Sequence, residues 1–136
     1  MQSGMSNLKL VVVCAAVLGI GAFLFVATHS GYDSRRHVGE AIEEAAPFKA
    51  RVAEFHERNK ALPQAADAPM LRQDQKLRRA RSVEWDAGRR MIVVTMDGQP
   101  YPGKRFGWIA DEREGRLEWT CRPLDMEAKY LPAACR

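Results

Sequence analysis

The hydrophobic residues of this chain follow three successive patterns, and the first is an unbroken apolar run. Residues 10–28, "LVVVCAAVLGIGAFLFVAT", contain nineteen positions without a charge. As a helix the run would span ~28 Å, close to the ~30 Å hydrocarbon core of a bilayer. It therefore predicts a membrane helix, and a cleaved secretory signal, with a shorter apolar core and a more basic start, is the alternative. The side chains expected to face lipid or neighbouring helices include Leu10, Val13, Val17, Leu24 and Phe25.

The second pattern has the period of a helix with one buried side. Apolar residues recur every three or four positions, and charged residues occupy the other side of the wheel. Pro47 should bend this helix, and "NKALP" at 59–63 should end it. The pattern predicts one long helix over about residues 8–59, whose second half packs against the rest of the protein through Val38, Ile42, Phe48, Val52 and Phe55.

The third pattern alternates, as strands do. After an irregular connection at 64–81, strands are expected around Val83 and Trp85 and over 89–96, 105–112 and 116–121, joined by short turns. Such strands form an antiparallel meander, whose apolar face needs the helix as a cover. We therefore predict an α+β fold with a long N-terminal helix on a four-stranded antiparallel sheet. Its regions are a short segment at 1–9, a transmembrane helix at 10–28 and one domain at 29–136.

The three cysteines are divided between the two ends of the chain. Cys14 lies in the apolar run and should be a reduced, small hydrophobic residue, whereas Cys121 and Cys135 share the terminal stretch. A pair of thiols there suits a disulfide and hence an oxidising compartment, and two free thiols are the alternative. An N-terminus in the cytoplasm and a C-terminal domain in the periplasm or beyond follow from this placement.

Charge is close to balanced overall, with 21 Lys and Arg against 17 Asp and Glu. One stretch is basic, and it can hold an anionic polymer, DNA or lipid headgroups, with an affinity that falls as salt rises. A solvated loop with no partner is the alternative interpretation. The basic residues of this stretch are Arg72, Lys76, Arg78, Arg79, Arg81, Arg89 and Arg90.

The sequence contains no arrangement of residues that indicates an enzyme. Neither a nucleophile with a base nor a phosphate-binding loop is present, so we expect no catalytic residue and no cofactor. His37, Glu40 and Glu44 can share one helix face, but one helix supplies too few ligands for a metal site. His56 is expected on the helix surface. The three tryptophans are expected in the core or on the sheet.

Two segments resemble the type IV pilins and their pilin-like relatives. "RRHVGEAIEEAAPFKARVAEFHERNKALP" is similar to the pilin helix and its Lys-x-x-Pro exit, and "GRLEWTCRPLDMEAKYLPAACR" is similar to the pilin ending, with W-x-C, K-Y-L-P and a final Cys. The resemblance implies that Cys121 and Cys135 form the bridge that closes the C-terminal loop against the sheet. Closure of this loop would contribute about 3 kcal/mol by the chain-entropy estimate.

The N-terminus departs from the pilin pattern. Pilins carry a basic leader, a glycine at the cleavage site and a glutamate as the fifth mature residue. If Gly4 marks the cut here, Met5 is the first mature residue and Lys9 the fifth, after a leader of four residues without Lys or Arg. Lys9 would place like charges together in an apolar surrounding. A sequence altered for expression, or a start codon that truncates the leader, would also explain the difference.

These observations predict a pilin-like subunit of a bacterial type IV pilus or related filament, minor or atypical, that acts in assembly, adhesion or motility. Its partners would be other pilin subunits, the assembly machinery and inner-membrane lipid, with DNA or a surface anion as a further candidate. The alternatives are an inner-membrane-anchored protein of the same fold that does not polymerise, and a DNA-binding minor pilin. Its expected location is the inner membrane, with the C-terminal domain in the periplasm or on the cell surface.

Overall fold

The computed structural model describes residues 3–71 and 76–136. Contacts divide the chain into two compact units, Met1–Asp33 and Ser34–Arg136, which are described separately. The helices and strands are α1 (Ser3–Asn59), η1 (Ala65–Leu71), β1 (Ala80–Asp86), β2 (Met91–Met96), β3 (Arg105–Arg113), β4 (Arg116–Pro123), η2 (Ala128–Tyr130) and η3 (Ala133–Cys135).

The first unit consists of the N-terminal part of α1. The side chains of residues 9–25 are all exposed, and apart from Lys9 they are uncharged. In the part of the chain that the structure describes, no helix is both long enough and apolar enough to cross a membrane. The transmembrane helix predicted over residues 10–28 is therefore not confirmed.

The second unit begins with the remainder of α1, whose apolar stripe faces the sheet. Val38, Phe48 and Val52 are buried in the core, and Ile42 and Phe55 are partly buried against it. The helix continues through Pro47, an exposed position, and ends at Asn59. The next residue, Lys60, has a left-handed backbone with φ of 53°, and its N–H donates to the carbonyl of His56. This geometry closes the last helical turn.

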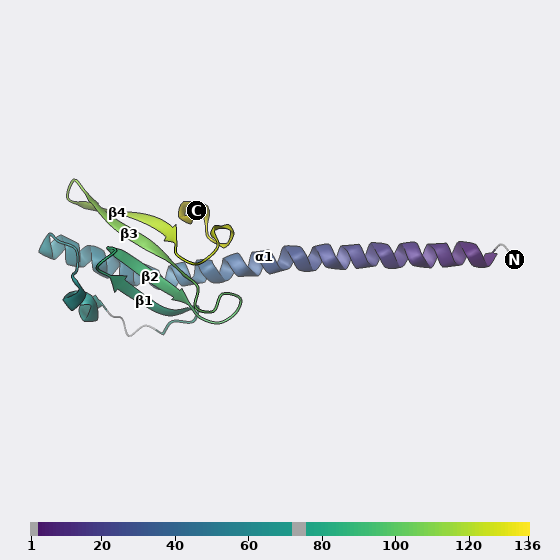
Figure 1. Cartoon of the computed structure of the whole chain (residues 1–136), viewed down its shortest axis with the longest axis horizontal. Coiled ribbons are helices and arrows are strands. Elements are labelled where there is room, and N and C mark those ends of the chain that lie inside the picture. The colour runs from purple at the N-terminus through teal and green to yellow at the C-terminus, as the bar shows by residue number, and fades with distance from the viewer. Residues whose placement is uncertain (1–2, 72–75) are drawn as a thin grey trace. The chain divides into compact units, whose positions relative to one another are not determined.

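The four strands form one antiparallel sheet in the order β1-β2-β3-β4, which confirms the predicted meander (Figure 1). Successive residues of a strand point to opposite faces. Ile92, Trp108 and Cys121 lie in register across the three strands and are buried in the core with α1. Burying each large apolar side chain stabilises the fold by roughly 1.5–3 kcal/mol.

The starts of the first two strands differ from those predicted. The first strand begins at Ala80, before Val83, where the Glu44 carboxylate of α1 accepts a hydrogen bond from the backbone N–H of Ala80. Arg89 and Arg90 belong to the turn between β1 and β2 and not to the strand. Asp86 accepts a hydrogen bond from the N–H of Arg89, and Arg90 adopts a left-handed φ of 51°, so the chain reverses here before β2 begins.

A short helix lies against each of the two edge strands. η1 lies against β1, and η3 lies against β4. The indole Nε1–H of Trp85 in β1 donates to the carbonyl of Pro63, 2.8 Å away, and so holds the segment that leaves α1. Edge strands otherwise present unpaired backbone groups to other chains.

Candidate functional site

The C-terminal loop is closed by the predicted disulfide. Cys121 in β4 and Cys135 in η3 are bonded, with their Cα atoms 4.5 Å apart, and both are buried. Cys14 is a free and exposed cysteine. The bond ties the last residues of the chain to the sheet, as the resemblance to pilins implied.

The closed loop carries its own small core. Leu131 and Met126 are buried, and the ring of Tyr130 lies 4.7 Å from that of Tyr101 in the β2–β3 connection. Burial raises the pKa of the Tyr101 phenol. The apolar side chains thus fix the loop from inside, and its exposed residues remain available for contact. Those exposed residues are Asp125, Glu127, Ala128, Lys129, Pro132, Ala133, Ala134 and Arg136.

A carboxylate fixes the point where the loop leaves β4. Asp125 accepts hydrogen bonds from the backbone N–H of Arg105 and from its guanidinium Nε, the latter 2.7 Å away. Burial alone would raise the pKa of Asp125, but the hydrogen bonds and charge of Arg105, with a contribution from Lys104, lower it. An ionised Asp125 therefore holds the loop to the first residue of β3.

Two further carboxylates, both on α1, hold the start of β1 to that helix. Glu44 accepts hydrogen bonds from the backbone N–H groups of Arg78, Arg79 and Ala80, at distances of 3.0–3.2 Å. Glu40 binds the side chain of Arg79, and the hydrogen bond from Arg79 is the main cause that lowers the pKa of Glu40. The acidic helix face that contains His37 is thus occupied by structural contacts, with Glu40 and Glu44 bound to the chain itself.

The helix also presents a lysine to the sheet. The Lys49 ammonium lies 5.7 Å from the Trp108 ring centroid and 5.2 Å from that of Trp119, within range of cation–π attraction. Burial lowers the pKa of Lys49. These contacts place the two aromatic rings in the helix–sheet interface, in agreement with the expectation that they belong to the core or the sheet.

The prediction that His56 lies on the helix surface is wrong. Only 3% of His56 is exposed, and its Nε2 lies 3.2 Å from Oε1 of Glu112 in β3. His56 is near the end of α1, where the sheet still covers the helix. On a helical wheel His56 falls on the polar side of α1. It is buried because β3 extends as far as Glu112, which lies beside it.

The residues of the predicted basic patch do not form one surface. Arg78, Arg79 and Arg81 lie around the start of β1, whereas Arg89 and Arg90 lie beyond its end. The strand between them has seven residues, and seven residues extend about 20 Å. Four of the arginines have carboxylate partners within 4.0 Å: Glu44, Glu40, Asp97 and Asp86. Lys76 and Arg90 are exposed, and Arg72 lies outside the described residues.

The predicted filament-helix residues lie on a surface that the described structure leaves uncovered. Leu10, Val13, Val17, Leu24 and Phe25 are each 57–64% exposed. Gly4 and Met5 belong to α1, and Lys9 is exposed beside the apolar residues. An apolar surface of this extent marks a site of contact with protein or lipid.

Sequence reasoning missed the contacts that connect distant segments. The spacing of Glu40 and Glu44 indicated a shared helix face, but nothing in it identified backbone amides of residues 78–80 as partners. The sequence likewise did not indicate the pairing of Arg105 with Asp125, because these residues are twenty positions apart and meet only when the C-terminal loop folds back.

Comparison with known protein families gives one assignment. The family model described as pilin, bacterial filament, matches residues 34–136. The match covers the whole second unit, from the sheet-facing part of α1 to the C-terminal loop. A comparison with curated proteins finds no match.

Proposed function

The chain belongs to the pilin family of bacterial filament proteins, and from that membership we propose that it is a minor or atypical subunit of a type IV pilus or related filament. Its work would be assembly: the exposed apolar part of α1 packs against the same segment of neighbouring subunits, and the second unit forms the filament surface. Adhesion or motility would then be properties of the assembled filament.

One observation carries this proposal: the contrast between the exposed apolar residues of α1 and the rest of the molecule. Ten large apolar side chains between residues 10 and 25 are exposed by 57–74%. Removing such surface from water is favourable by roughly 25 cal/mol per Å², so copies of the chain gain free energy when these surfaces meet. Inner-membrane lipid would offer similar surroundings before assembly, because hydrocarbon and protein interiors are both apolar.

The disulfide supports a location for the second unit outside the cytoplasm. Disulfides persist in oxidising compartments and are rare in the cytosol. The bond between Cys121 and Cys135 therefore supports a second unit in the periplasm or on the cell surface. The proteins that move the subunit into the filament would act on it there.

Lys9 is the reason for proposing a minor or atypical subunit. Its ammonium lies at the start of the exposed apolar segment. Packing that segment among other helices would take the charge out of water, at a cost of several kcal/mol unless a carboxylate pairs with it. A subunit with this cost would enter the filament less often than one with an acidic residue.

Cysteine cross-linking on whole cells tests the proposal, since Cys14 lies on the surface that would pack. A membrane-permeant bis-maleimide should join Cys14 of one subunit to Cys14 of another, and the linked species should appear in sheared filaments. Cys14→Ser is the control, because its disulfide and second unit are unchanged. Peptide mass analysis of the sheared fraction identifies the mature N-terminus.

The same experiment addresses the second candidate, an accessory protein of the pilin fold that does not polymerise. Lys9 is the observation that favours it. Protein that is absent from sheared filaments, that remains with the inner membrane and that gives no Cys14-linked species would contradict the filament role and support the accessory role.

A further inference from the structure

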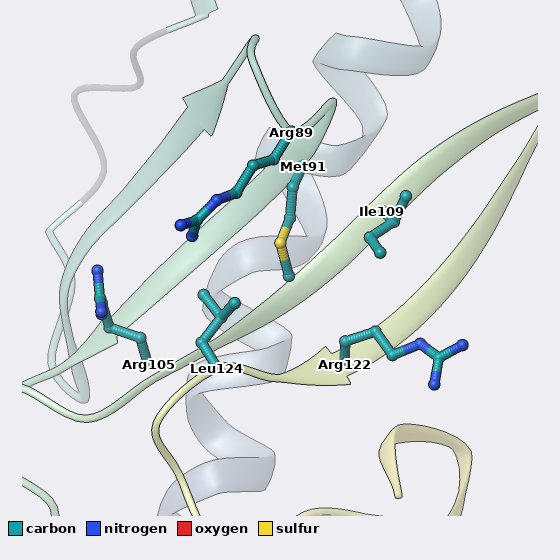
Figure 2. Close-up of a pocket in the computed structure, with 6 residues that line it drawn as sticks. All are labelled: Arg89, Met91, Arg105, Ile109, Arg122 and Leu124. Carbon is teal, nitrogen blue, oxygen red and sulfur yellow. The ribbon is translucent and has the colours of Figure 1, made fainter.

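A pocket of about 520 Å³ lies on the face of the sheet that is turned away from α1 (Figure 2). Its floor is formed by Met91 of β2, Ile109 of β3 and Leu124, which follows β4. Met91 and Ile109 lie opposite each other in the register, and both alternate with core residues. The pocket belongs entirely to the second unit and does not involve the surface proposed for filament packing.

Gly107 lies on the same face of the sheet as Met91 and Ile109. It lies between Val93 of β2 and Arg122 of β4, and it has no side chain to fill the centre of the face. A Cβ at this position would lie 1.8 Å from the carbonyl oxygen of Ile92 and 3.1 Å from Cε of Met91. Only glycine fits here, and the Met91 side chain covers it.

Every charged side chain that lines the pocket is an arginine. Arg89 and Arg105 lie on one side of the apolar floor, and Arg122 lies on the other (Figure 2). Arg105 is held by Asp125, and Arg89 is 3.8 Å from Asp86, in a pair exposed to solvent. Arg122 has no ion-pair partner among residues 3–71 and 76–136. No carboxylate lines the pocket, although Asp125 and Asp86 offset part of the charge of Arg105 and Arg89 from outside it.

We propose that this pocket binds a small amphiphilic anion, a carboxylate or phosphate group carried on an aromatic or aliphatic stem. The oxyanion lies between Arg89 and Arg105, because a guanidinium matches carboxylate and phosphate oxygens in pairs. The stem lies over Met91 and Leu124 and extends toward Ile109. Arg122 lies at the far side, with its guanidinium extended away from Met91 and Leu124 (Figure 2).

The size and the mixed lining favour this ligand over the other anions. Small-molecule sites have volumes of roughly 300–1,000 Å³, with an apolar lining and a few polar groups that fix the orientation. A free phosphate ion would leave the apolar floor empty. A nucleic-acid backbone needs a series of cations along a track, whereas the arginines here surround one hollow. The pocket thus recognises an anion and its apolar stem together.

Methyl NMR on the full-length chain in a non-ionic detergent tests the proposal. Phenyl phosphate and 3-phenylpropionate serve as the probes, and they distinguish a phosphate ligand from a carboxylate ligand. At least one should shift the methyl signals of Met91, Ile109 and Leu124 in a saturable manner. Arg89→Gln should weaken that binding about tenfold, the effect of losing a charged hydrogen-bond partner. Leu124→Ser should weaken it by a smaller factor.

Arg90→Gln is the matched control, because Arg90 lies in the same turn as Arg89 and does not line the pocket. It should change the affinity by less than about twofold, as expected for an exposed charge outside the site. If Arg89→Gln and Arg90→Gln weakened probe binding equally, the effect would come from general surface charge, and this result would overturn the proposal. So would shifts of the same size with inorganic phosphate, displacement of the probes by a DNA duplex, or no saturation up to about 10 mM.

Discussion

The two parts of α1 differ in what surrounds their apolar side chains. In the first unit, Phe23 is 74% exposed, and no described residue covers it. In the second unit, Phe48 is 4% exposed and lies beneath the sheet. Both residues follow the spacing of a helix, but only the second has its partners within the same chain.

This difference separates stability from assembly. The second unit obtains its hydrophobic stabilisation internally, so its fold should not depend on the first unit's side chains. The apolar side chains of the first unit are exposed to water, so they would gain hydrophobic free energy on contact with another molecule. Substitutions in the two units should therefore produce different defects.

The largest effect should come from matched phenylalanine substitutions. Phe106→Ala removes a fully buried ring and should lower the free energy of unfolding of the second unit by about 3–5 kcal/mol. Phe23→Ala should change it by less than about 0.5 kcal/mol and should instead reduce the amount of protein in sheared filaments. Thermal unfolding followed by near-UV circular dichroism measures the first quantity. Equal destabilisation by the two substitutions would contradict the separation.

The next largest effect concerns the disulfide. Replacing Cys121 and Cys135 together with serine opens a loop of sequence separation 14 and should cost about 3 kcal/mol. Denaturant unfolding under non-reducing conditions measures the loss. Cys14→Ser should leave the unfolding midpoint unchanged, and a shift with this control would mean that the exposed thiol contributes to the fold.

A smaller loss is expected when the attachment of β1 is weakened. Glu44→Gln replaces a carboxylate that accepts three backbone hydrogen bonds with an amide whose NH₂ group cannot accept. The free energy of unfolding should fall by about 1–3 kcal/mol. Glu43→Gln changes the same charge at an exposed neighbour, and its urea unfolding curve should match that of the unaltered protein. If both variants lose the same stability, charge and not hydrogen bonding is responsible.

The smallest effect is on the pH dependence of stability. The pKa values of Glu40 and Asp125 are lowered in the folded protein, so both carboxylates bind protons more readily when the chain unfolds. The stability they contribute is complete above the ordinary carboxylate pKa of about 4 and is lost as the pH falls through their lower folded values. The melting temperature should therefore decline below about pH 4.

Glu40→Gln should make that decline less steep, since one of the two carboxylates no longer takes part. Glu43→Gln is again the control and should retain the full slope. A melting temperature that is independent of pH between about 2 and 5 would contradict the contribution of both groups.

Patterns along the chain predicted the long helix and the four strands of the second unit and their topology, but not the short helices η1, η2 and η3. The helical stripe of α1 and the alternation in β2 and β3 are local signals, and the short turns leave a meander as the simple arrangement. Glu114 and Gly115, both with positive φ, form one of the predicted short turns, the one between β3 and β4. The Cys121–Cys135 bond was predicted through the resemblance to pilins.

The features that the sequence did not reveal depend on where distant segments meet. His56 is buried because Glu112 and its strand extend over the end of α1. The arginines of the pocket come from a turn, the first residue of β3 and the end of β4, and the basic stretch predicted earlier included only Arg89. Residue types alone cannot show which of many arginines will surround one hollow.

The short helices beside both edge strands have a consequence for how copies of the protein can aggregate. With η1 against β1 and η3 against β4, a strand from another molecule has less room to extend the sheet. Amyloid growth and strand exchange begin from such open positions. For the filament subunit that we propose, fewer open positions would favour association through side chains when copies are concentrated.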